Sequence, residues 1–554
     1  MTDNYFIADQ FTLLSKLMDI HGENSFKSKS YSIAAFNIEK LPVQLSELPA
    51  DKISGLKGIG DSTGKKILEI IQQGKLSSLE DLVNKTPSGI IEMLSIKGLG
   101  PKKINTIWKE MQLESLGELL YACQENRLLL YKGFGAKTQE NVKDSIEFYF
   151  HHKGSFLYAE IETYALTLNN ELLKKFPGQL INITGAFRMQ NEIITELEWI
   201  TAVSEPEITS FLKSLDIEIE SSADDVFKYR SKENIPLKFN FTKKEDFYPR
   251  LFTSSCSPEF LIAWMKKYSI PVSALSEEEI FTSQKINFIP ACLRENEYII
   301  DKAFAGPLPE TIQVDDVKGI IHSHSNWSDG VNTIEEMARA CIEKGYEYLV
   351  ISDHSKSAFY ANGLQEDRIR EQHKLIDELN EKYAPFKIFK SIESDILNDG
   401  SLDYPDEILK SFDLVIASVH SNLKMTEEKA MSRLLKAIEN PYTTILGHMT
   451  GRLLLSRNGY PVNISAVIAA CKQHRVVIEL NAHPRRLDLD WHFIPQAIEQ
   501  GLLISIDPDA HSIEGYRDVR YGVLAAQKGA LTKENNLSSF TRDEFEEFLA
   551  SVKK

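Results

Sequence analysis

The sequence has few cysteines, no long apolar run and no excess of positive charge. Its 5 cysteines are scattered over 554 residues and include no Cys-x-x-Cys pair. This pattern is typical of a reducing compartment and excludes a zinc site built from thiolates. No run of about 20 apolar residues is present to span a membrane, and the start MTDNYFIADQ lacks the layout of a signal peptide. We therefore expect a cytoplasmic protein that does not contact a membrane.

The charge balance limits how the chain could contact nucleic acid. The formal net charge is −17, from 80 acidic and 63 basic residues. A broad basic face is therefore excluded, and any contact with nucleic acid has to be local and has to use backbone donors as well as lysines. A chain of this length also exceeds a single hydrophobic core, which indicates three or four domains.

Short β-type runs alternate with amphipathic helical stretches from about residue 315 to the end. There are seven such runs, among them KGIIHSH, YEYLVISDH and LLISIDPDAH, and segments such as NTIEEMARACIEKGY separate them. Near-continuous apolar strands in this alternation predict βαβ units, a parallel sheet and a (β/α)7-type barrel. In such barrels the active site forms at the carboxyl ends of the strands.

Each of these runs ends in His, Asp or Glu. The candidate metal ligands are His322, His324, Asp329, His354, Glu393, His420, His448, Asp509 and His511. A lone histidine at a strand end is usually a loop residue, but nine such side chains at matching positions indicate convergence. Imidazoles and carboxylates without thiolates favour Zn²⁺, Mn²⁺ or Fe²⁺. Nine ligands exceed the need of one ion, so we expect three divalent ions.

Three segments in the first 150 residues share a second pattern. ISGLKGIGDSTGKKILEII, LSIKGLGPKKINTIWKEM and LLYKGFGAKTQENVKDSI each place Lys-Gly-x-Gly before a basic helical run. Repeated three times, this is a helix–hairpin–helix signature, in which glycines let the backbone approach a phosphate and helix N–H groups bind it. Such contacts carry no base code, so binding should be independent of sequence. The predicted DNA-binding residues are Gly58, Gly60, Lys65, Lys66, Gly98, Gly100, Lys102, Lys103, Gly133, Gly135 and Lys137.

The motifs HSHSNWSDG, SDHS, IESDI, SVHS, GH and DAH resemble the successive motifs of the PHP (polymerase and histidinol phosphatase) phosphoesterase family. The resemblance covers residues 315–554 and implies metal-dependent hydrolysis of a phosphoester. It implies one ion held by His322, His324, Glu393 and Asp509, a second held by Glu393, His420 and His448, and a third held by Asp329, His354 and His511. It further implies that Arg452 contacts the phosphate, so Arg452, Glu393 and His324 are the predicted catalytic residues. Met449 and His483 replace a proline and an asparagine that are usual in the family.

Together, the hairpins and the PHP motifs resemble a bacterial family X DNA polymerase with a C-terminal PHP domain. The resemblance implies a multidomain protein with N-terminal all-α helix–hairpin–helix domains, an α+β nucleotidyltransferase-like palm and thumb, and the (β/α)7-type PHP barrel. The expected domains are an N-terminal helical domain (1–82), a helical fingers domain (83–150), a degenerate palm (151–236), a thumb-like domain and linker (237–312) and the PHP domain (313–554).

The palm segment ITGAFRMQNEIITELEWI departs from the family. Gly185 is kept, but Ala186 replaces a serine, and Glu196 and Glu198 replace the aspartate pair that holds two magnesium ions. The third carboxylate position aligns with Lys238, and the later Thr-Gly-Ser element has lost its glycine at Ser254. Magnesium requires near-ideal octahedral geometry. We therefore expect no Mg²⁺ at the palm and a vestigial polymerase site at Gly185, Glu196, Glu198 and Lys238.

These patterns predict a DNA-binding, metal-dependent phosphodiesterase, with 3′→5′ exonuclease and abasic-site endonuclease action in base-excision repair. The expected partner is gapped, primer–template or abasic DNA, bound by a monomer that is associated with the nucleoid. The alternatives are an active family X polymerase with a proofreading PHP domain, a phosphatase of the histidinol-phosphate type, and a DNA-binding scaffold. An amidohydrolase also opens with His-x-His, but that family uses fewer histidines. The hairpins argue against the small-molecule phosphatase, and the full set of ligands argues against the scaffold.

Overall fold

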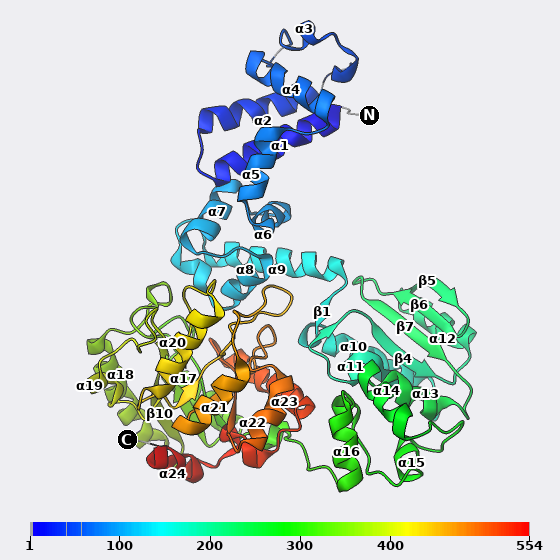
Figure 1. Ribbon diagram of the computed structural model, residues 1–554, viewed down its shortest axis with the longest axis vertical. Helices are drawn as coiled ribbons and strands as arrows, with labels where there is room; N and C mark the ends of the chain where they lie inside the picture. The colour runs from blue at the N-terminus through cyan, green and yellow to red at the C-terminus, as the bar shows by residue number, and fades with distance from the viewer. Residues whose placement is uncertain (1–3, 40, 42, 57, 553–554) are drawn as a thin grey trace. The chain divides into compact units, whose positions relative to one another are not determined.

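A computed structural model describes residues 4–39, 41, 43–56 and 58–552 of the chain. The chain folds into two compact units, Met1–Tyr149 and Phe150–Lys554, which Figure 1 colours from blue to cyan and from cyan to red. Within the described part of the chain, no helix is long and apolar enough to cross a membrane. All five cysteines are buried free thiols, in keeping with a structure that does not depend on disulfides.

The described residues of the first unit form helices joined by short turns, as the sequence predicts. One of these helices, α8, begins with a capping box, in which the Ser115 hydroxyl accepts from the N–H of Glu118 and the Glu118 carboxylate accepts from the N–H of Ser115. The elements are α1 (Asn4–Ile20), α2 (Ser25–Glu39), η1 (Leu45–Glu47), α3 (Ala50–Ile53), α4 (Asp61–Gln73), α5 (Ser77–Lys85), α6 (Ser88–Glu92), η2 (Met93–Ser95), α7 (Pro101–Asn105), η3 (Thr106–Glu110), α8 (Leu116–Gln124), η4 (Arg127–Leu130) and α9 (Ala136–Lys153).

The second unit begins with an α+β region. Its five-stranded sheet has the order β2-β4-β7-β6-β5, in which β4 and β7 are parallel and the other neighbours antiparallel. The boundary expected at 236/237 falls inside β7, so the sheet extends to Phe241. The elements are β1 (Phe156–Leu157), α10 (Tyr158–Lys175), β2 (Ile181–Thr184), α11 (Gly185–Arg188), β3 (Ile193–Ile194), β4 (Leu197–Thr201), α12 (Glu205–Ser214), β5 (Glu218–Ala223), β6 (Val226–Arg230) and β7 (Pro236–Phe241).

A helical region follows the sheet and has its own apolar core. Phe252, Phe260, Trp264 and Phe281 are fully buried there. The elements are α13 (Phe247–Ser254), α14 (Pro258–Lys267), α15 (Glu277–Thr282), η5 (Ala291–Leu293) and α16 (Glu297–Ala305).

The rest of the second unit is the predicted parallel barrel. Seven strands follow one another in chain order, β8 to β14, with each neighbouring pair parallel. A parallel bridge between Ser323 and Ala510 joins the segments that follow β8 and β14, so the barrel is nearly closed. The strands are β8 (Gly319–Ile320), β9 (Tyr348–Ile351), β10 (Lys387–Asp395), β11 (Leu414–Ser418), β12 (Ile445–Leu446), β13 (Val477–Asn481) and β14 (Ile504–Asp507).

Helices surround this barrel, as Figure 1 shows. They are amphipathic, and their apolar faces pack on the outward side chains of the strands, so both faces of the sheet are buried. The elements are η6 (Val314–Asp316), α17 (Ile334–Glu343), η7 (Phe359–Ala361), α18 (Glu366–Tyr383), α19 (Asp406–Leu409), α20 (Glu427–Glu439), α21 (Ile464–His474), η8 (Trp491–Phe493), α22 (Ile494–Glu499), η9 (Ile513–Asp518), α23 (Val519–Lys528), η10 (Lys533–Asn535), η11 (Leu537–Ser539) and α24 (Arg542–Val552).

Aromatic side chains fill the amino-terminal end of the barrel interior. Phe545 of α24 stacks on Tyr348 at a ring-centroid distance of 4.7 Å and meets Phe389 edge-on at 4.9 Å. These rings belong to one buried cluster with the inward residues of the central strands. Because α24 closes this end, the polar side chains gather at the opposite, carboxyl end.

We expect Phe545→Ala to destabilise the barrel by about 3–5 kcal/mol, because it leaves a cavity between two aromatic rings. Phe548→Ala, three residues further along α24, is the matched control and should cost much less, because Phe548 is only partly buried. The shift of the urea unfolding midpoint measures both effects. Equal shifts for the two variants would contradict this account of α24.

Candidate functional site

The nine candidate ligands lie at the carboxyl end of the barrel, on or just after the strands. Glu393 is part of β10, while the histidines lie in the segments that leave the strands. His322 and Asp509 adopt left-handed backbone conformations, with φ of 58° and 51°. Such strain in residues other than glycine is tolerated where the surrounding structure imposes it, and it is concentrated at functional sites. Gly330 is also required, because a Cβ there would lie 2.1 Å from the carbonyl oxygen of His324.

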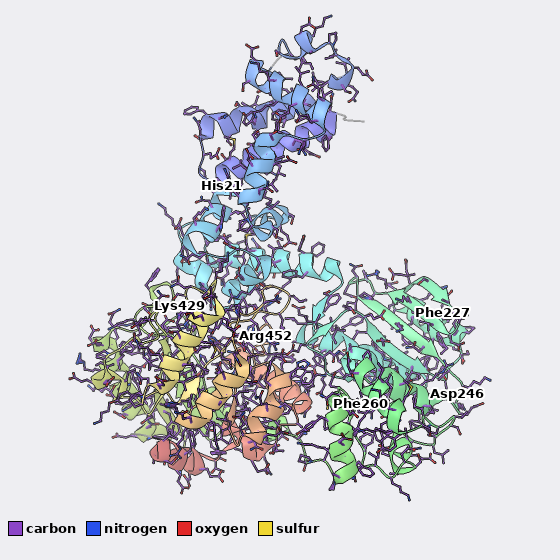
Figure 2. All side chains as sticks on the ribbon, viewed as in Figure 1. His21, Phe227, Asp246, Phe260, Lys429 and Arg452 are labelled. Atoms are coloured by element: carbon purple, nitrogen blue, oxygen red, sulfur yellow. The ribbon has the colours of Figure 1, made fainter. Side chains whose placement is uncertain are left out.

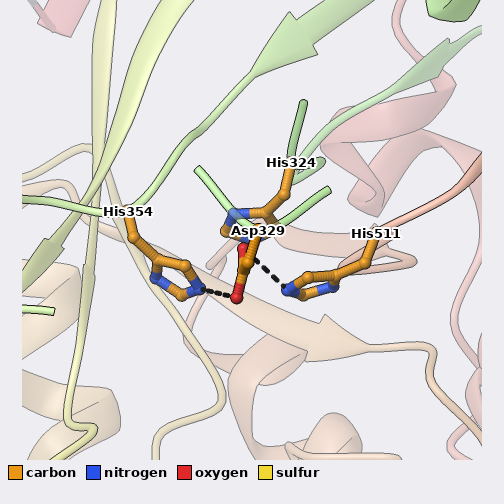
Figure 3. A group of neighbouring side chains, drawn as sticks. All are labelled: His324, Asp329, His354 and His511. Atoms are coloured by element: carbon orange, nitrogen blue, oxygen red, sulfur yellow. Dashed lines mark ion pairs between the residues drawn. The ribbon is translucent and has the colours of Figure 1, made fainter. Parts of the chain in front are cut away.

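One group consists of Asp329 and the three histidines around it, and Figure 3 shows it. The oxygens of Asp329 lie 3.6 Å from Nε2 of His354 and 3.5 Å from Nε2 of His511, and His324 completes the group. The Asp329 side chain is only 3% exposed, and no described residue hydrogen-bonds its carboxylate oxygens. A buried carboxylate in this state requires a positive partner.

A second group joins His322, His324 and Asp509. Oδ1 of Asp509 lies 3.4 Å from Nε2 of His322 and 3.1 Å from Nε2 of His324. Glu393 lies beside it, with Oε1 3.3 Å from the same His322 nitrogen. The motifs predict a shared ion for His322, His324, Glu393 and Asp509, and these four side chains lie together in the structure.

Glu393 also faces a third group. Its Oε1 lies 3.0 Å from Nε2 of both His420 and His448, and its Oε2 lies 2.9 Å from Nδ1 of His354. A central position for Glu393 was expected. His324 and His354 each belong to two of the three groups. This sharing was not predicted from the sequence.

The spacing of these atoms fits bound divalent ions. Ligand atoms held about 2.1 Å from one ion lie roughly 3.0–3.4 Å apart in octahedral or tetrahedral geometry. The separations in the three groups run from 2.9 to 3.6 Å. The donor set and its geometry therefore suit divalent metal binding.

Burial and neighbouring charges shift the pKa values of the histidines in opposite directions. Burial, with His511 and His354 nearby, lowers the pKa of His324 to about 3, so its imidazole is neutral and able to ligate. Burial opposes charge on His420 as well, but Glu393 and Asp395 raise its pKa to about 10. Despite burial, the surrounding imidazoles lower the pKa of Glu393 well below its usual value, so it stays a carboxylate.

Two carboxylates that the sequence analysis missed orient the ligands. Glu479 is hydrogen-bonded to Nδ1 of His322 and accepts from the backbone N–H of His448 at 2.5 Å. Asp395 lies 2.6 Å from Nδ1 of His420. The contacts with His322 and His420 each fix one ring nitrogen and turn the other towards the centre. Asp395 could have been found from the IESD motif, because residues two apart in a strand share a face.

Arg452, labelled in Figure 2, forms its ion pairs with residues outside the set of nine ligands. Its guanidinium pairs with Glu192 of the α+β region and with Asp490, each at 2.5 Å, and donates to the carbonyls of Arg486 and Leu487. That Arg452 binds a substrate phosphate therefore stays a prediction. The ion pairs with Glu192 and Asp490 do not favour it, because they already occupy the guanidinium. Arg486 lies nearer, with Nε 3.8 Å from Oδ2 of Asp509.

The palm carboxylates pair with lysine. The register of β4 and β7 places Glu198 opposite Lys238. Nζ of Lys238 lies 2.8 Å from Glu198 and 3.5 Å from Glu196, and Lys228 contacts Glu196 from β6 at 3.5 Å. Burial opposes charge on Lys238, but both glutamates raise its pKa, so it remains an ammonium between them.

The turn at Gly185 is closed as well. A Cβ on Gly185 would lie 2.2 Å from Oε1 of Glu198, so the longer side chain covers the turn. Arg188 forms a two-armed ion pair with Glu277, at 2.9 and 2.6 Å, and donates to Ser255 at 3.0 Å. This pair is not evident from the sequence, because its partners are 89 residues apart.

The three hairpins of the first unit have the same backbone geometry. Gly58, Gly98 and Gly133 have φ of 81°, 90° and 96°. In each hairpin the next residue donates to the carbonyl three residues before it, as Ile59 does to Leu56 at 3.0 Å, Leu99 to Ile96 at 3.1 Å and Phe134 to Tyr131 at 3.1 Å.

The second glycine of each hairpin precedes a helix. No described atom lies within 4 Å of a Cβ built on Gly60, Gly100 or Gly135. Internal packing therefore does not require glycine there, which favours close approach of an outside group. Lys65, Lys102 and Lys137 are exposed beside these glycines, whereas Lys66 donates to Ser78 at 2.7 Å and Lys103 to Gly98 at 3.1 Å.

We expect Glu479→Gln to lower divalent-metal affinity about 10–100-fold, because the charge that orients His322 is lost. Metal retained after dialysis against a competing chelator measures the change. Glu439→Gln, an exposed change on α20, should leave retention at the wild-type level. Unchanged retention in the Glu479 variant would refute the orienting role.

Family comparisons agree with this arrangement. A helix–hairpin–helix domain matches residues 2–76, a SAM-like helix–hairpin–helix tandem matches 90–147, and the PHP domain matches 321–483. The DNA polymerase/3′-5′ exonuclease PolX of Bacillus subtilis is 33% identical over 96% of each chain. A probable phosphatase of Caldanaerobacter subterraneus is 30% identical over 34% of this chain and 74% of its own. The chain therefore belongs to the bacterial family X DNA polymerases that carry a C-terminal PHP domain.

Proposed function

We propose that the chain is a metal-dependent 3′→5′ exodeoxyribonuclease whose catalytic centre is the carboxyl end of the PHP barrel. The observation that carries the proposal is the set of nine ligands, all but His420 and Asp329 in buried residues, at 2.9–3.6 Å separations. The Bacillus relative is named a 3′-5′ exonuclease, which supports the direction of attack. The hairpins supply the contact with DNA.

Divalent ions held by these residues would lower the pKa of a water molecule, neutralise phosphate oxygens and stabilise the leaving oxygen. Glu393 contacts the groups from both sides and holds them together. Glu479 and Asp395 keep His322 and His420 turned inward. Arg486, at the edge of the Asp509 group, is placed to bind a phosphate oxygen.

The ligand set favours three ions. His322, His324, Glu393 and Asp509 would hold one, Glu393, His420 and His448 the second, and Asp329, His354 and His511 the third. Nitrogen and oxygen ligands suit Zn²⁺, Mn²⁺ or Fe²⁺. The DNA would be gapped, primer–template or abasic, bound without base recognition by a monomer, with abasic-site cleavage as a second outcome in repair.

We also propose that templated polymerisation is lost. Lys238 places a positive charge between Glu196 and Glu198, where a polymerase needs room for two magnesium ions about 3.5–4 Å apart. Glu198 covers Gly185, and Glu277 neutralises Arg188. The palm thus serves as a scaffold that contacts the barrel through Arg452 and Lys528.

We expect His324→Ala to reduce nuclease activity below detection while DNA affinity stays within two-fold of wild type, because the ligands and the hairpins belong to different units. Cleavage of a 5′-labelled primer–template with Mn²⁺ measures the first effect, and fluorescence anisotropy measures the second. Equal loss of cleavage and affinity would contradict the division of roles.

The converse variant is Lys102→Ala with Lys137→Ala. DNA affinity should fall, and the slope of log K against log salt should flatten by about one unit for each lost phosphate contact. Lys374→Ala is the matched control, because its side chain is 81% exposed on α18 of the barrel. A similar change of slope in that control would weaken the assignment of the hairpins.

We expect no primer extension with Mg²⁺ or Mn²⁺, even in the His324→Ala background, where added nucleotides cannot be removed. Aspartates restored at positions 196, 198 and 238 together should also fail, because Ala186, Ser254 and the Arg188–Glu277 pair keep the phosphate turn altered. Gel analysis with all four dNTPs is the measurement. Extension by the His324 variant would show that the glutamate pair is competent.

A further inference from the structure

A fully buried arginine of α20 lies beside the carboxyl ends of β10 and β11. Arg433 is buried, yet its guanidinium forms no ion pair with any carboxylate in the described part of the chain. An apolar side chain of similar volume would fill this place without the cost of removing a charge from water. Packing alone therefore does not explain a guanidinium at this position.

The guanidinium donates to backbone carbonyls on two separate chain segments. Its Nε donates to the carbonyl of Leu397 at 3.1 Å, and its Nη2 donates to the carbonyl of Ile396. Its Nη1 donates to the carbonyl of Ser421 at 3.0 Å. Arginine has five N–H donors in a fixed planar arrangement, so one side chain can hold carbonyls on both segments at once.

These carbonyls lie just beyond the point where the pairing of β10 with β11 ends. The last pair of the parallel register is Asp395 with Ser418, and the N–H of Ile396 still donates to the carbonyl of Ser418 at 2.7 Å. Ile396 also forms a bridge with Leu402 of its own segment. Arg433 therefore joins the two segments where the sheet no longer does.

The turn after β10 is fitted to the same part of α20. Gly400 has a φ of 86°, and a Cβ there would lie 3.0 Å from the carbonyl oxygen of Arg433 and 2.9 Å from Cβ of Lys436. Nζ of Lys436 lies 2.9 Å from the exposed carboxylate of Asp399 in this turn. The helix thus holds the turn at two places, and only Arg433 also reaches the second segment.

Both segments carry side chains of the metal centre. Ile396 directly follows Asp395, and Ser421 directly follows His420. Asp395 lies 2.6 Å from Nδ1 of His420, and Nε2 of the same ring lies 3.0 Å from Oε1 of Glu393. A shift of one segment against the other would change these distances, because the ring lies between two carboxylates of β10.

We propose that Arg433 is a positioning residue for the ion at His420. Its guanidinium fixes the spacing of the segments that carry Asp395 and His420, so the imidazole stays turned towards Glu393. The inference rests on the proposed metal-dependent function. It adds a residue outside the nine ligands on which one of the ions depends.

Arg433→Lys is the deciding variant, because it keeps the charge but loses the planar fork that reaches both segments. After loading with Mn²⁺ and dialysis against a competing chelator, it should retain about one equivalent less than the wild type. Its kcat on a primer–template should fall about 10–100-fold while KM stays within about two-fold. Lys436→Met is the matched control on the same helix and should match the wild type in both measurements.

A second variant separates positioning from a general effect on the fold. His420→Ala should also lose about one equivalent of Mn²⁺, and Arg433→Lys added to it should remove no more, because both changes act on the same ion. Unchanged retention in Arg433→Lys, or a further loss in the double variant, would overturn the positioning role. A wild type that keeps Mn²⁺ but cleaves no DNA would overturn the nuclease function, and metal retention would still decide the role of Arg433.

Discussion

Buried negative charge has to be balanced by positive charge close by, since a carboxylate removed from water is costly without a partner. The barrel gathers Asp329, Glu393 and Asp509, each at most 3% exposed, around a cluster of imidazoles. The closed amino-terminal end leaves these groups at one end of the barrel. Ligand spacing, strained backbone and orienting carboxylates all follow from the need to hold cations there.

The α+β region meets the same requirement in another way. Glu196 and Glu198 are balanced by Lys238, whose ammonium is attached to the chain. A tethered cation cannot be exchanged, cannot bridge two substrate oxygens and cannot acidify a water molecule. The same electrostatic problem therefore yields a site that accepts dissociable ions in the barrel and a fixed structural ion pair in the palm.

Much of this could be predicted from the sequence, because parallel strands place their carboxyl ends at one edge and each run ended in a ligand type. The hairpins were predictable because a repeated glycine pattern implies a repeated turn. Glu479 was missed because it lies inside an apolar strand and looks like an isolated charge. Arg452 could not be placed, since its partner Glu192 is 260 residues away. The boundary predicted at 236/237 lies within β7, because the alternating pattern of this strand continues to Phe241.

The contacts between the α+β region and the barrel bear on what the palm does for the barrel. Arg452, Arg485 and Arg520 of the barrel side pair with Glu192, Glu160 and Glu162 of the α+β region, and Lys528 pairs with Glu295 of the helical region that follows it. Arg485 is 3% exposed in its pair with Glu160, and Lys528, 1% exposed, also donates to the carbonyl of Met189 in the palm, so deletion of the palm would strand buried cations. The palm therefore has a structural role that is separate from nucleotide binding, because it supplies the partners of buried cations on the barrel.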